Sequence, residues 1–114
     1  MTAEEFAKNF YIEKQNLVEQ SFDFKRERRS YVSVKIQELN LDEQQNEKLK
    51  HIVSALLTDA FYTILLGLDG STVIGETQET FKIYDTQNKL ISDCGELEAE
   101  AWEYFHNGKL NQEK

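Results

Sequence analysis

The first 66 residues of this chain contain neither proline nor glycine, and the whole sequence of 114 residues contains no proline. These two residues disfavour a helix interior most strongly, by about 3 kcal/mol for proline and about 1 kcal/mol for glycine relative to alanine. A segment without them lacks the usual signals that end a helix or form a tight turn. The sequence therefore predicts a helical first half and places the turn-rich structure after Gly67.

The first helix is predicted over residues 3–21, because Thr2 and Glu5 have the spacing of a capping box. The next segment, residues 25–39, is ambiguous. Its apolar side chains at residues 31–36 alternate as in a strand, but several of them also fit one helix face. We predict a helix because no turn signal separates the segment from its neighbours, and a strand remains the alternative.

A long third helix is predicted to begin after Asp42, which forms a second capping pattern with Gln45, and to end near Leu66. Its second half is apolar nearly all round, so we expect it to be the buried centre of the domain. On this prediction Leu56→Ala costs about 2–5 kcal/mol of stability. The apolar positions that share one helical face are Leu49, Ile52, Val53, Leu56, Leu57, Ala60 and Ile64.

After Gly67, a predicted helix C-cap, the hydrophobic period changes to two. Residues 77–84 and 90–92 predict a β-hairpin, and residues 72–74 are a possible third strand. A last helix is predicted over residues 96–106, because an Asn-Gly pair follows it.

Together these elements predict an α+β fold that is mainly helical. It has about four helices, one of them long and central, and a small antiparallel β-hairpin or three-stranded sheet before the last helix. The length suits one domain, and no repeat or linker divides the chain. We therefore predict a single domain over residues 1–108 and a loose C-terminal tail over residues 109–114.

The chain has no recognisable export signal, and its only cysteine is Cys94, which has no partner for an internal disulfide. The most apolar stretch, residues 52–68, is interrupted by four polar residues, so we do not expect it to span a membrane. These observations predict a cytoplasmic protein.

The formal net charge is −8, from 13 basic and 21 acidic residues. An acidic chain is a poor general ligand for nucleic acid, and a basic protein partner suits it better. Residues 67–114 hold ten of the acids against four lysines, whereas residues 25–29 form a small basic cluster. We predict that the partner binds acids of the last helix and of the preceding loops, namely Asp69, Glu76, Glu96, Glu100 and Glu103.

No pattern in the sequence indicates catalysis. The glycines at positions 67, 70 and 75 match neither a phosphate-binding loop nor a calcium loop. The two histidines and Cys94 are far apart, so we predict no enzyme activity, no metal site and no cofactor. Asp59, on the shoulder of the apolar stripe, is expected to accept a structural hydrogen bond.

The segment AFYTILLGLDGSTVIG, with FKIYDTQNKLIS and GELEAEAWEYFHNGK after it, resembles small acidic bacterial proteins of unassigned function. Some such proteins are immunity proteins for secreted or contact-delivered toxins. The resemblance covers about residues 42–108 and has no catalytic signature, so no functional residue is carried over from it. It implies a stoichiometric binder whose acidic surface mimics the nucleic-acid substrate of a toxin.

Two functions follow from these observations. The first is an immunity or antitoxin-type protein that neutralises a basic, nuclease-type toxin by binding it. The alternative is a homodimeric structural or regulatory protein without catalytic activity. In that dimer the helices of residues 3–39 would pair and bury Phe10, Leu17 and Val32.

Overall fold

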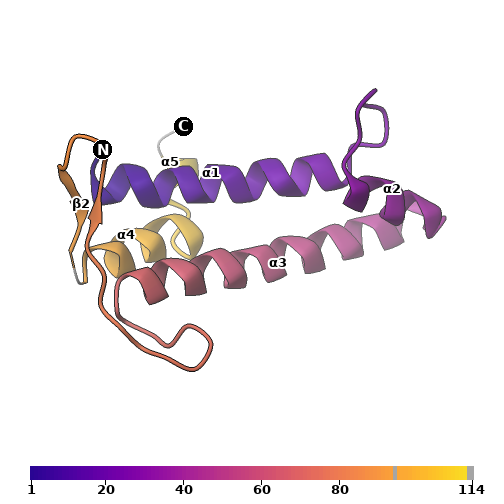
Figure 1. The fold of residues 1–114 in the computed structure, drawn as a ribbon. Helices are drawn as coiled ribbons and strands as arrows, with labels where there is room; N and C mark the ends of the chain where they lie inside the picture. Colours follow the sequence, from indigo (N-terminus) through magenta and orange to yellow (C-terminus); the bar gives the residue numbers. More distant parts are fainter. Residues whose placement is uncertain (94, 113–114) are drawn as a thin grey trace.

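The fold is seen in a computed structural model that describes residues 1–93 and 95–112. Two long antiparallel helices form its frame, a shorter helix lies against one end of them, and a small hairpin precedes that helix (Figure 1). This arrangement confirms the predicted fold class. The elements are α1 (Ala3–Ser21), α2 (Tyr31–Glu38), α3 (Glu43–Leu68), β1 (Ile83–Tyr84), β2 (Leu90–Ser92), α4 (Glu96–Phe105) and α5 (Lys109–Gln112).

Side-chain caps set the starts of the first three helices. Thr2 accepts a hydrogen bond from the Glu5 amide at 3.1 Å, and Asp42 forms a complete capping box with Gln45. Ser30 accepts from the Ser33 amide, also at 3.1 Å, so that residues 31–36 are helical and not extended. Because α2 begins only at Tyr31, the basic residues before it belong to a loop.

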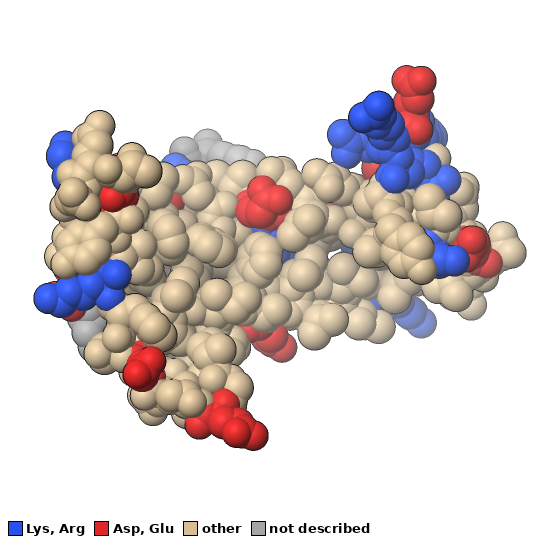
Figure 2. Space-filling model, in the orientation of Figure 1, with Lys and Arg blue, Asp and Glu red and all other residues tan. Residues whose placement is uncertain are grey.

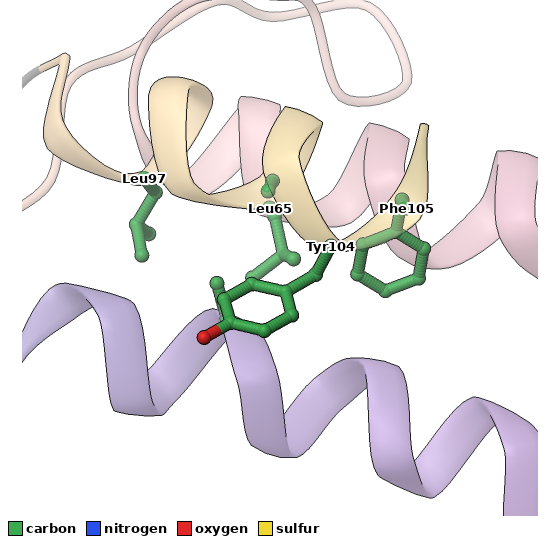
Figure 3. Packing of buried hydrophobic residues seen from close by; sticks show 6 residues of the cluster. Leu65, Leu97, Tyr104 and Phe105 are labelled. Atoms are coloured by element: carbon green, nitrogen blue, oxygen red, sulfur yellow. The ribbon is translucent and has the colours of Figure 1, made fainter. Parts of the chain in front are cut away.

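The hydrophobic core occupies one end of the helix pair, where α1, α3 and α4 meet. Tyr104 and Phe105 of α4 lie close to Leu65 of α3, and these side chains face α1 (Figure 3). Ala7 of α1 and Ala101 of α4 are fully buried, and their small side chains allow the helices to approach closely. The buried members of the cluster are Ala7, Leu65, Leu97, Ala101, Tyr104 and Phe105.

The orientation of α3 differs from the predicted one. Leu56 is 65% exposed and Ile52 63% exposed, whereas Leu65 is fully buried. Both α1 and α4 pack on one side of α3, as Figure 1 shows, and the face predicted to be buried points away from them. Since the second half of α3 is apolar nearly all round, its periodicity could not indicate which side they cover. The predicted cost of Leu56→Ala through core disruption is therefore wrong.

The hairpin is shorter than predicted. Only Ile83–Tyr84 and Leu90–Ser92 pair, in antiparallel register, and the possible third strand is reduced to an isolated bridge between Ile74 and Thr77. Residues 78–82 form no strand, because this segment returns along a loop that is hydrogen-bonded to the end of α3. Gln78 Nε2 donates to the Gly70 carbonyl at 2.8 Å.

Gly67 has a different role from the predicted helix cap. It lies inside α3, which continues to Leu68, and Asp69 is the C-cap residue. A Cβ atom at position 67 would collide with the Ile74 side chain. Gly67 therefore lets the loop after α3 cross close over the helix.

The part of the predicted tail that the structure describes, residues 109–112, forms the short helix α5. Lys109 at its start donates to Glu4 of α1 at 2.8 Å, so this segment is attached to the domain. The molecule measures 46 × 36 × 28 Å. By length and composition alone, α3 is also suitable for crossing a bilayer, and it is mostly exposed.

Candidate functional site

Asp69, predicted on the partner surface, is a buried structural residue that is 1% exposed. Its Oδ1 accepts hydrogen bonds from the amides of Gly95 at 2.8 Å and Leu97 at 3.1 Å. Its Oδ2 accepts from the amide of Glu98 at 3.2 Å and from the Ser71 hydroxyl at 3.0 Å. A carboxylate at a helix N-terminus satisfies amides that have no partner within the helix, and it is favoured by the helix dipole.

The cap of α4 therefore comes from α3 and not from its own N-cap residue. That residue is Gly95, which adopts φ 94° and has no side chain to accept a hydrogen bond. Because the Asp69 carboxylate is enclosed and fully engaged, the structure removes it from the predicted partner surface. The three backbone amides that Asp69 caps lie 26–29 residues away in sequence, so no local spacing rule could have found them.

The predicted acids of α4 differ in burial, since Glu96 is exposed whereas Glu100 and Glu103 are partly buried. Glu96 accepts from the Asp93 amide at 3.2 Å, and Glu103 accepts from the Asn107 side chain at 2.9 Å. Glu76 is exposed on the loop after α3. The predicted acidic surface therefore retains Glu76, Glu96, Glu100 and Glu103, and several of these acids also have contacts within the chain.

Glu100 belongs to a charged network at the junction of α1, α4 and α5. Glu4 accepts hydrogen bonds from Lys109 at 2.8 Å and from the Tyr104 hydroxyl at 3.0 Å, and these bonds lower its pKa. The hydrogen bond to Glu4 raises the pKa of Lys109. Glu100 Oε2 lies 3.9 Å from Lys109 Nζ; it is enclosed and accepts no hydrogen bond from any described residue.

Three of these acids line a cleft of about 630 Å³ between the start of α1, β2 and α4. The carboxylates are those of Glu4, Glu96 and Glu100, and the apolar lining includes Leu90 and Ala99. A cleft with carboxylates beside apolar walls suits a lysine or arginine side chain, whose alkyl stem packs on apolar surface while its cationic end binds acids.

The remaining candidate residues do not form a site. Asp59 is exposed on α3 and accepts no side-chain hydrogen bond from the described residues, so the structural hydrogen bond predicted for it does not form there. His106 packs edge-on against Tyr62, with ring centroids 4.5 Å apart, whereas His51 is exposed. Cys94 lies outside the described residues. Within residues 1–93 and 95–112, no group of three potential metal ligands comes together.

A polar groove of about 500 Å³ separates α1 from α3 beyond the core. In it Lys14, only 7% exposed, donates to the Ser54 hydroxyl at 2.8 Å and lies 5.6 Å from the centre of the Tyr11 ring. Burial lowers the pKa of this lysine. Sequence inspection missed the pair, because its members are 40 residues apart.

A lysine with a lowered pKa beside a serine can in principle act as a base and a nucleophile. Acyl transfer also needs hydrogen-bond donors for the oxyanion. Ser54 lies in the interior of α3, where the neighbouring backbone amides are used by the helix itself. The pair therefore satisfies a buried lysine and is not a catalytic dyad.

The basic cluster of residues 25–29 lies at the opposite end of the molecule from α4 (Figure 1). Figure 2 shows blue side chains gathered at the α2 end and red ones on the loop after α3. Arg29 is used within the domain, since it donates to the Ser33 carbonyl at 2.9 Å and lies over the Phe24 ring. Lys25, Arg26 and Arg28 are exposed.

Comparison with known proteins adds no relative. No protein-family model matches the chain, and no curated protein and no solved structure matches it.

Proposed function

We propose that this protein is a binding module without catalytic activity that recognises a basic protein, and that it acts in the manner of an immunity protein against a nuclease-type toxin. The observation that carries this proposal is the acidic cleft between α1, β2 and α4. Three carboxylates, those of Glu4, Glu96 and Glu100, line it, and Lys109 contacts two of them.

The charge of the cleft supports a cationic occupant. Its three carboxylates face one lysine of the same chain, Lys109, so the cleft keeps a negative charge that a lysine or arginine from a partner would balance. Leu90 and Ala99 would contact the alkyl stem of such a side chain. The other predicted acids, the exposed Glu76 and the partly buried Glu103, would act mainly by accelerating association with a basic surface.

The experiment compares two double variants that change the net charge equally. Glu96→Gln with Glu100→Gln neutralises the cleft, and Glu13→Gln with Glu43→Gln neutralises two exposed acids elsewhere. Each protein serves as bait in cells of the natural host, and the captured proteins are quantified by mass spectrometry. The proposal expects a basic protein that the wild type and the second variant retain and that the cleft variant loses about tenfold or more.

The captured protein is then purified and its association rate is measured at low and high salt. We expect the rate to fall with salt for the wild type and to be lower and less salt-dependent for the cleft variant. Equal capture and equal rates for the two double variants would reject the cleft as the recognition site.

A further inference from the structure

The outward face of α3 carries an apolar stripe that no residue in the described part of the chain covers. Its centre consists of Ile52, Leu56, Ala60 and Ile64, four residues apart, with Leu49 and Val53 at its edge. Ile52, Leu56 and Ile64 are all among the exposed large hydrophobic residues. At 1.5 Å per residue the four central positions extend along about 18 Å of helix. A continuous exposed stripe of this length indicates an interaction surface.

The molecule as a whole exposes more surface than a compact monomer of its mass. The chain exposes 7887 Å², whereas a compact monomer of 13.3 kDa exposes about 6,500 Å². Its radius of gyration is 16.5 Å, against about 13 Å for a compact domain of this length. The excess of roughly 1,400 Å² exceeds the roughly 800 Å² that each partner contributes to a stable interface.

The distribution of charge favours a second copy of this chain over a membrane. The central residues of the stripe are uncharged, and the charged residue beside it is Asp59, which is exposed and lies one residue from the middle of the stripe. Arg26 of the basic loop and Lys50 of α3 line the same surface pocket, so this loop lies beside the first half of α3, and the end of α3 leads into the loop with Glu76 and Glu79. Antiparallel pairing of two α3 helices therefore brings the basic end of each chain to the acidic end of the other. Net charge alone opposes a second copy as it opposes an anionic lipid surface, because each chain carries −8, but only a second copy offers a basic end to the acidic loop.

We propose that α3 forms the interface of a symmetric homodimer in which two copies of the helix pack antiparallel. With the two-fold axis at the level of Thr58, Ile52 packs on the partner's Ile64. Leu56 packs over the small side chain of the partner's Ala60. Each contact occurs twice, as a two-fold interface requires.

This interface is distinct from the dimer predicted on residues 3–39. Phe10, one of the side chains expected to be buried there, packs inside the chain, with its ring centre 5.0 Å from that of Phe6 and 6.1 Å from that of Phe61. The new interface also leaves the acidic cleft free, because that cleft is lined by α1, β2 and α4. The homodimer does not depend on the function proposed above.

Sedimentation of the purified chain over micromolar to submillimolar concentrations tests the proposal. We expect the wild type to reach twice the chain mass of 13.3 kDa. Leu56→Glu should weaken the dimer more than about 100-fold, because it places two carboxylates in an apolar interface. Its circular dichroism should stay unchanged, since Leu56 is exposed in the single chain. Leu39→Glu, at an exposed leucine outside α3, is the matched control and should remain dimeric.

Cross-linking tests the direction of pairing in a background where Cys94 is replaced by serine. Leu56→Cys combined with Ala60→Cys should oxidise to a covalent dimer, because the antiparallel register pairs these two positions. Leu56→Cys alone should cross-link less. A wild type that stays monomeric at the highest concentration overturns the proposal. So does a monomer that floats with phosphatidylcholine–phosphatidylglycerol vesicles, since that result would assign the stripe to lipid.

Discussion

The cap that Asp69 provides to α4 gives the sharpest test of the fold. Asp69→Ala removes the carboxylate that accepts from the amides of Gly95, Leu97 and Glu98. Loss of a helix cap costs about 0.5–2 kcal/mol. The Leu97 amide is also buried at this position, and leaving it without an acceptor costs about 1–3 kcal/mol more. We therefore expect Asp69→Ala to lower the free energy of unfolding by about 2–5 kcal/mol.

Urea unfolding followed by circular dichroism measures this loss directly, and thermal unfolding provides a second estimate. At about 4 °C per kcal/mol for a domain of this size, the midpoint should fall by about 8–20 °C. Hydrogen exchange adds a local readout, since the Leu97 and Glu98 amides should exchange faster in the variant. Asp69→Asn keeps one carbonyl acceptor but presents an NH₂ group to the remaining donors, so its loss should be smaller.

Asp59→Ala is the matched control, because it removes the same carboxylate from an exposed position ten residues earlier. Its effect should stay within about 0.5 kcal/mol. If Asp69→Ala and Asp59→Ala are equally stable, the Asp69 carboxylate does not hold α4 to α3, and the structural role given to it here is wrong.

Three further predictions concern the core, the charged network and the loop after α3. Leu65→Ala should cost about 2–5 kcal/mol and Leu56→Ala less than about 1 kcal/mol, measured by urea unfolding at a dilution where the chain is monomeric; the reverse order would contradict the orientation of α3. The pKa of Glu4 is lowered from 4.5, so its stabilising effect is present above about pH 4.5 and is lost as the pH falls through the lowered value. Thermal midpoints measured against pH should show a shallower acid decline for Glu4→Gln than for the wild type, and identical profiles would refute the contact with Lys109. Gly67→Ala should cost about 1–3 kcal/mol by collision with Ile74, and adding Ile74→Ala should restore most of the loss in a double-mutant cycle; additive losses would show that the two residues do not meet.

Local physics accounts for what could be predicted from sequence. The caps at Thr2 and Asp42 act within four residues, so the starts of α1 and α3 could be predicted. The scarcity of helix breakers and the change to a two-residue period likewise located the helical half and the hairpin. The concentration of acids after Gly67 is a property of the sequence itself.

Contacts between distant residues decided the rest. Because the second half of α3 is apolar nearly all round, only the packing of α1 and α4 could determine that Leu65 is buried and Leu56 exposed. The sequence alone showed that Asp69 follows a long helix. Only the tertiary structure, by bringing the start of α4 against the end of α3, made its carboxylate a buried cap instead of a surface acid. The chemistry of a side chain is a property of its own residue, but its burial depends on helices and loops that are distant in the sequence.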